Sequence, residues 1–187
     1  MNWLVAAVIT WAFFGLELGL GEMLRIGEGD IGPSFIAVLM TFIALHAPAK
    51  SATWAALILG FLADLTWTIE RSDGGVGYPL GATALGMVLG ARLIIAARGS
   101  LRGDHPLTLI FMTTAAGFVT QIVITAIFSF RQLYGDAVIR SPTEQLGERL
   151  LSSLYSGLLL GLVLWLPLRF LVQPIMGFPA DRSTRPR

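Results

Sequence analysis

The chain has 187 residues, of which 55% are hydrophobic and only 13% are charged, and its net charge is +1. Soluble domains carry about 25% charged residues, so this composition excludes an ordinary soluble protein and indicates a polytopic membrane protein. The absence of cysteine excludes disulfides, thiol catalysis and thiolate metal sites. Two histidines at the edges of apolar runs do not predict a metal or triad site, and the charge balance argues against nucleic acid as a partner.

Six apolar runs separated by polar links predict an all-α bundle of six transmembrane helices, which form a single domain over residues 1–176. The first run has about 22 residues, or roughly 33 Å as a helix, which is enough to cross the apolar core of a bilayer. It lacks the basic start and the cleavage site of a secretory signal, so we expect it to be retained. The expected spans cover about residues 3–24, 33–47, 51–69, 79–97, 106–130 and 149–171.

Proline and polar residues predict where several of these helices begin and end. Pro33 suits the first turn of the second helix. Only a few residues link the end of the second helix to the third, which predicts that these two helices form an antiparallel pair. The run Ser141-Pro142-Thr143-Glu144 matches a capping box, so the last helix is predicted to start before its membrane span. Pro167 is expected to kink or end that helix, and residues 177–187 are predicted to form a disordered cytoplasmic tail.

Asp64 stands out because it follows thirteen uncharged residues in the third run. An aspartate at membrane depth is costly unless it has a partner or a purpose. We expect a buried structural residue, either protonated or hydrogen-bonded, that supports the turn into the helix after Pro79, Leu80 and Gly81. Helical spacing places it on a face of small and polar side chains that cannot point at lipid: Ala52, Ala56, Gly60, Asp64 and Thr68.

Strips of small residues at four-residue spacing predict close contacts between helices. One strip is Gly15 and Gly19 in the first run, and a second is Ala82, Gly86 and Gly90 in the fourth. Each is a candidate surface for a partner helix, with internal packing as the alternative.

Polar side chains inside apolar runs predict interior positions. Glu17 in the first run and Gln121 in the fifth are the two that we expect inside the protein. Gln121 belongs to a regular stripe that should face protein or a cavity, either for interhelical hydrogen bonds or to line a ligand site: Thr113, Gly117, Gln121, Thr125 and Ser129.

The distribution of basic residues predicts the orientation in the membrane. With six spans and a cytoplasmic N-terminus, eight lysines and arginines lie on the inner side and five on the outer side. The positive-inside rule therefore favours both termini in the cytoplasm.

The third and fourth runs resemble a known family. Gly60-Phe-Leu-Ala-Asp64-Leu65, followed by Pro79-Leu80-Gly81 and a small-residue helix, is similar to the G-x-x-x-D-L and P-L-G signature of the rod shape-determining protein MreD family. The motif resemblance covers residues of about 31 to 95. Asp64 and Pro79 lie further apart than in typical members, with residues 67–78 as an apparent insertion.

The resemblance implies a non-enzymatic subunit of the bacterial cell-elongation machinery in the plasma membrane, without a cofactor. Its implied partners are an MreC-like single-span protein and, beyond it, a RodA-type peptidoglycan polymerase with its transpeptidase. The family is also similar in fold to the substrate-binding S components of energy-coupling-factor vitamin transporters, which makes an S component the alternative function.

An enzymatic function has little support in the residue inventory. The carboxylates are scattered, with no histidine among them, so the chain lacks a nucleophile, base or metal set at one depth. Glu17 and Asp64 could form a carboxylate pair, but two such acids would more readily share a proton or accept a hydrogen bond from Gln121 or a threonine. We therefore expect no catalytic site.

Overall fold

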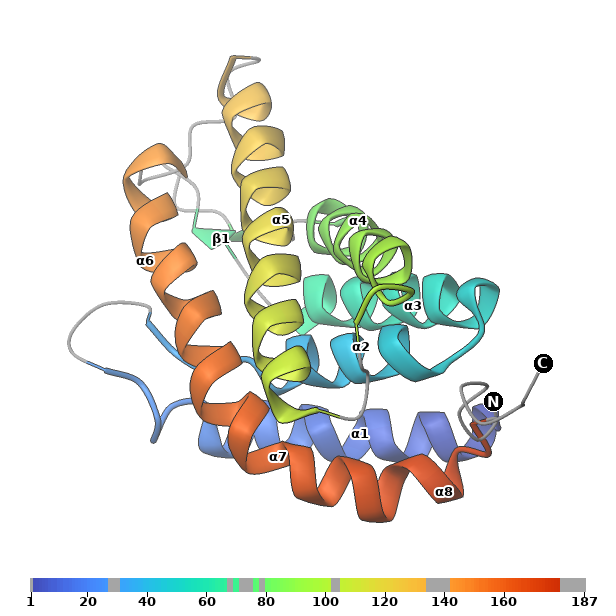
Figure 1. The fold of residues 1–187 in the computed structure, drawn as a ribbon. Helices are drawn as coiled ribbons and strands as arrows, with labels where there is room; N and C mark the ends of the chain where they lie inside the picture. The colour runs from blue at the N-terminus through green and yellow to red at the C-terminus, as the bar shows by residue number, and fades with distance from the viewer. Residues whose placement is uncertain are drawn as a thin grey trace.

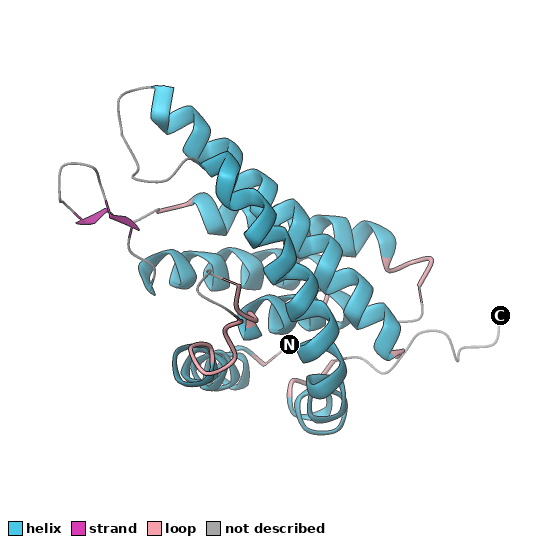
Figure 2. Ribbon diagram, turned by 90° about the vertical axis from the view of Figure 1, so that its left-hand side faces the viewer, coloured by secondary structure: helices cyan, strands magenta, loops and turns pink. Residues whose placement is uncertain are grey.

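The computed structural model describes residues 2–26, 31–66, 69–70, 76–77, 80–101, 105–133 and 142–178 (Figure 1). The prediction of an all-α fold is confirmed, apart from one two-stranded ladder. Strands β1 (Ile69–Glu70) and β2 (Val76–Gly77) pair antiparallel and project from the side of the helices (Figure 2). The first five helices are α1 (Trp3–Leu20), α2 (Phe35–His46), α3 (Ala49–Thr66), α4 (Ala82–Ala97) and α5 (Pro106–Leu133).

The helix starts follow from local capping. Asn2 and Ser34 have extended backbones, and their side chains accept hydrogen bonds from the backbone N–H groups of Leu4 and Ala37. Such caps satisfy donors that have no partner within the helix. Proline occupies the first position of α5, where its missing N–H costs nothing. The second helix therefore begins two residues after Pro33, close to the predicted start.

The last helix is continuous from Pro142 to Ile175, but its hydrogen-bonding pattern changes along its length. It consists of α6 (Pro142–Tyr155), π-helical η1 (Ser156–Leu160), α7 (Gly161–Pro167), π-helical η2 (Leu168–Val172) and α8 (Gln173–Ile175). Figure 1 shows that α6 and α7 run in different directions, as expected where π-helical turns interrupt an α-helix.

Two predictions concern the C-terminal part of the chain. Of the two outcomes expected at Pro167, a kink or an end of the helix, the end does not occur, because a π-helical turn follows it and the chain stays helical to Ile175. The predicted disordered tail begins too early. The ring of Phe178 lies 6.1 Å from the rings of both Phe42 and His46, so it packs on the end of α2. Residues 179–187 of that tail lie outside the described residues.

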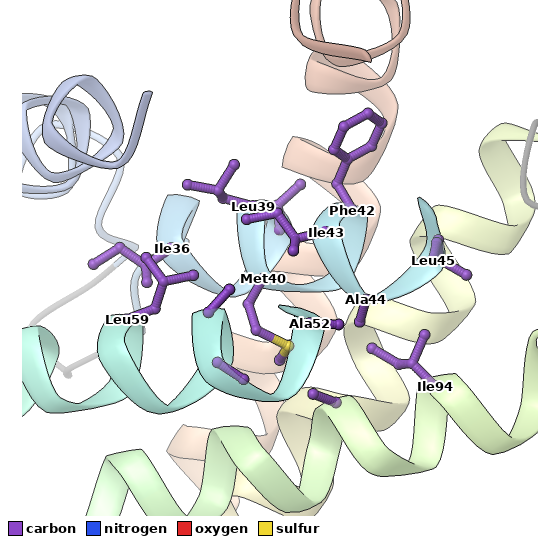
Figure 3. Packing of buried hydrophobic residues seen from close by; sticks show 14 of the residues in the cluster. Ile36, Leu39, Met40, Phe42, Ile43, Ala44, Leu45, Ala52, Leu59 and Ile94 are labelled. Atoms are coloured by element: carbon purple, nitrogen blue, oxygen red, sulfur yellow. The ribbon is translucent and has the colours of Figure 1, made fainter. Parts of the chain in front are cut away.

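The short helix α2 lies at the centre of the fold. It contacts α1, α3, α4, α5 and η1, and ten of its twelve residues are buried. Figure 3 shows its apolar side chains meeting Ala52 and Leu59 of α3 and Ile94 of α4. A helix that is apolar on all sides belongs in a protein core or in lipid, and the burial of α2 places it in the core. The largest hydrophobic cluster is therefore built around α2.

Arg98, which follows α4, binds the C-terminal end of α2. Its guanidinium donates hydrogen bonds to the backbone oxygens of Ala44, at 3.3 Å, and Ala47, at 2.6 Å. The last carbonyl groups of a helix lack partners within the helix and carry partial negative charge. An arginine side chain both donates hydrogen bonds to these groups and offsets their charge.

Glycine allows close contact at each successive interface from α3 onward. A Cβ atom on Gly60 of α3 would overlap the Cα atom of Ala84 in α4. A Cβ atom on Gly117 of α5 would lie 2.8 Å from the Cβ atom of Ser153 in α6. Gly157, in η1, is packed in the same way against the side chain of Thr114. Small residues at these points bring the helix backbones together, as in membrane helix pairs.

Within the part of the chain that the structure describes, three helical segments are long and apolar enough to cross a membrane: Trp3–Leu20, Pro106–Arg131 and Gln145–Ile175. Two further apolar helices, α2 and α4, are shorter. The two ends of the described chain lie together, because the backbone N–H of Asn2 donates a hydrogen bond of 3.1 Å to the oxygen of Met176.

Replacing Arg98 with Met should destabilise the protein, because it leaves the carbonyl groups of Ala44 and Ala47 without their donor. Each unsatisfied buried group costs about 1–3 kcal/mol. We expect the melting temperature of the detergent-purified protein to fall by several degrees. The exposed Arg92 of α4 is the matched control, and Arg92→Met should melt within about 1 °C of the parent. Equal melting temperatures for both variants would contradict this role of Arg98.

Candidate functional site

Asp64 is fully buried in the last turns of α3, with 0% of its surface exposed. Its carboxylate accepts three hydrogen bonds from backbone N–H groups at the start of α4: Gly81 at 2.8 Å, Thr83 at 3.0 Å and Ala84 at 3.3 Å. These donors have no partner within α4. Asp64 is therefore an N-terminal cap that one helix supplies to the next.

The conformation of Gly81 explains why this cap comes from outside α4. Gly81 is the N-cap residue with φ of 92°, a left-handed conformation that favours glycine. It has no side chain with which to cap the helix. A carboxylate at this position also interacts favourably with the positive end of the helix dipole. Leu80 is exposed beside the turn, and Pro79 lies outside the described residues.

Gly60 lies one turn before Asp64 on the same face of α3. Its lack of a side chain lets the backbone of α3 reach Ala84. Asp64 binds the N–H group of Ala84 and those of Gly81 and Thr83. The two residues of the predicted motif thus act on the same junction: one allows the approach of α4 and the other satisfies its first turn.

Glu17 in α1 makes an equivalent contact at the start of α2. One oxygen of its carboxylate accepts hydrogen bonds from the backbone N–H of Phe35, at 2.5 Å, and of Ile36, at 3.2 Å. Sequence analysis predicted an interior position for Glu17 but missed this capping role. Glu17 and Asp64 bind the starts of different helices, so the geometry gives no support to a shared catalytic pair.

Hydroxyl groups of the last helix hold the link between α1 and α2. Ser156 accepts a hydrogen bond of 2.8 Å from the backbone N–H of Ser34, and Ser152 donates to the oxygen of Gly32. Tyr155 donates to the oxygen of Leu24 at 3.2 Å. The region around Glu17 is thus a polar junction of α1, α2 and the last helix.

The polar stripe of α5 lies partly inside the protein. Thr113 and Thr125 are buried, and their hydroxyls have no hydrogen-bond partner among the described residues, whereas Gln121 is half-buried. Gly117, at the middle of the stripe, is in contact with Ser153 of α6. Part of the stripe therefore packs against the last helix.

Of the two candidate strips, the one on α4 is an internal packing surface, which was the alternative expected for it. Ala82, Gly86 and Gly90 are buried, and Gly86 and Gly90 pack against α5. A Cβ atom on Gly86 would lie 2.9 Å from the backbone oxygen of Thr120, and one on Gly90 would lie 3.0 Å from that of Ala116. The backbone of α5 already occupies this strip, so no partner helix can bind there.

The other candidate strip, on α1, is open. Gly15 and Gly19 are exposed on α1, and a Cβ atom on either would meet nothing within 4 Å. Large apolar side chains surround them, including Trp11 at 82% exposure and Leu18 at 64%. Only Ala6 and Phe13 of this helix are buried.

Among the described residues, no group of three or more histidine, cysteine, aspartate or glutamate side chains could hold a metal ion. The carboxylates of half-buried Glu17 and buried Asp64 bind backbone N–H groups. The site is thus a structural arrangement that fixes helix positions.

A model of a known protein family matches most of the chain. The sequence model of the family described as rod shape-determining protein MreD matches residues 1–175, which include both carboxylates and all the helices described above. No curated protein and no solved structure matches the chain.

Replacing Asp64 with Leu should be strongly destabilising, because three backbone N–H groups lose their acceptor at a cost of about 1–3 kcal/mol for each buried group. Asp64→Asn keeps one acceptor oxygen of similar position and should lose much less. Thermal unfolding of the purified variants measures the difference. A Leu variant that melts with the parent would show that the cap contributes nothing to stability.

Proposed function

The chain belongs to the MreD family of rod shape-determining proteins, and from this membership we propose that it is a non-enzymatic membrane subunit of the bacterial cell-elongation machinery. It acts by binding other membrane proteins of that machinery, without a cofactor and without turnover. The carboxylates of Glu17 and Asp64 support this proposal, since both are bound to the backbone at helix starts.

The proposed location is the bacterial inner membrane, with six membrane-embedded helices and both termini in the cytoplasm. Three long apolar segments and two shorter ones support a membrane-embedded bundle. The hydrogen bond between Asn2 and Met176 supports placing both termini on one side.

The proposed partner is an MreC-like protein with a single membrane span. The observation that carries this proposal is the uncovered face of α1, where Gly15 and Gly19 leave room for another helix backbone. Helices in lipid gain little from the hydrophobic effect and associate through close packing, which glycines permit. A RodA-type polymerase and its transpeptidase would join the same assembly through this partner or directly.

The alternative function as a vitamin-binding S component has no support from the comparisons, since the family match is to MreD and no solved structure matches.

Replacing Gly15 and Gly19 together with Leu should reduce copurification of the MreC-like partner at least about tenfold, since the loss of close packing across several residues costs more than about 1.4 kcal/mol. The melting temperature of the isolated protein should stay near that of the parent, because both positions are open. Affinity purification from cells that coexpress the two proteins measures the loss.

Gly147→Leu is the matched control, because Gly147 is another exposed helical glycine with nothing within 4 Å of a Cβ atom. Its variant should retain the partner. Parental copurification with the Gly15 and Gly19 double variant would place the interface elsewhere, and a parent that fails to retain any MreC-like protein would refute the proposed function.

The proposed orientation is tested by single cysteines in this cysteine-free chain. Met23 follows the first helix, α1, and Gly99 follows the fourth, α4, and both are exposed. In the proposed topology an odd number of helices precedes Met23 and an even number precedes Gly99, so the two positions lie on opposite sides of the membrane. We expect an impermeant thiol reagent to label Met23→Cys in intact cells, and to label Gly99→Cys only after the membrane is broken. The reverse pattern would place both termini outside the cytoplasm.

A further inference from the structure

The contacts of Glu17 and Asp64 are alike in the position of the acid within its helix. Helices α1 and α3 each contain 18 residues, and the acid lies in the last turn or so of each. Each carboxylate binds backbone N–H groups at the start of the next helix. In both cases the second helix, α2 or α4, has many buried residues.

The spacing along the chain is also the same. Phe35, the first residue of α2, follows Glu17 by 18 residues, and Ala82, the first residue of α4, follows Asp64 by 18 residues. The N-cap residues, Ser34 and Gly81, come one position earlier in each case. A single shift of 47 residues thus superposes the acids, the N-caps and the helix starts.

The same shift aligns buried residues inside the second helix of each pair. Met40 corresponds to Met87 and Ala44 to Ala91, and all four are buried in the main hydrophobic cluster. These identities lie on the inward faces of α2 and α4, where packing restricts the choice of side chain.

We propose that α1–α2 and α3–α4 are two copies of one structural unit, and that Glu17 is a positioning residue equivalent to Asp64. In each copy, a carboxylate near the end of the first helix fixes where the second helix begins. This inference does not depend on the proposed partner, since it concerns the arrangement of the four helices within the chain.

The two copies differ in how much of the first turn the acid must satisfy. Ser34 caps Ala37 with its own side chain, so Glu17 binds only Phe35 and Ile36. Gly81 has no side chain, and its own N–H is bound by Asp64 as well. Removal of either acid should therefore loosen its own helix start, and the effect should be larger at α4.

Hydrogen exchange of the detergent-purified full chain, resolved by mass spectrometry, tests this equivalence. Glu17→Leu should raise the exchange rate of the amides at residues 35–36 at least about tenfold and leave those at residues 83–84 unchanged, as for local opening. Asp64→Leu should give the reverse pattern. Glu22→Leu is the matched control, because Glu22 is exposed and pairs with Arg25, and it should change neither segment.

Glu17→Gln and Asp64→Asn keep an acceptor oxygen and extend the test to variants that fold well. Each should restore most of the protection of its own helix start, which a general loss of stability would not do. Parental exchange at residues 35–36 in both Glu17 variants would overturn the proposal. Equal loss of protection at both helix starts in the variants of either acid would overturn it too, because the two acids would then not act on separate units.

Discussion

The fold depends on holding a short apolar helix, α2, by both of its ends. A carboxylate from α1 binds its first N–H groups, and a guanidinium that follows α4 binds its last carbonyl groups. The two charges match the helix dipole at each end. Because α2 is buried on nearly all sides, water cannot satisfy these groups. The side chains of Glu17 and Arg98 therefore take the place of water at the two ends of α2. The same contacts link α1 and the region after α4 to the centre of the fold.

The sequence predicts the helices well, because apolar runs and capping residues are local signals. Pro33 and Pro142 mark helix starts that the structure has within two residues of the prediction. The position of Asp64 inside an uncharged run also indicates a buried residue, since an exposed acid at that depth is costly. The identity of its partners could not be predicted, because three N–H groups of another helix reach it only after α3 and α4 pack.

Contacts between distant segments account for the misses. The strip at Gly86 and Gly90 and the strip at Gly15 and Gly19 have the same spacing, so the sequence alone does not distinguish an internal surface from an open one. The structure separates them, because α5 lies against the first and no described residue lies against the second. The sequence gives no sign of the role of Arg98, since its contact with α2 joins residues 51 and 54 positions apart.

The turn before α4 shows why a carboxylate, and not a local hydroxyl, completes this junction. A serine in place of Gly81 could cap the helix only from an extended backbone, as Ser34 does at α2 with φ of −107°. The backbone at Gly81 has φ of 92°, which a residue with a Cβ atom rarely adopts. The direction of the chain into α4 thus excludes a local cap, and the acceptor must come from a neighbouring helix. Gly60 brings α3 close enough for Asp64 to provide it. The glycine in the turn, the glycine in α3 and the aspartate are therefore mutually dependent parts of one contact.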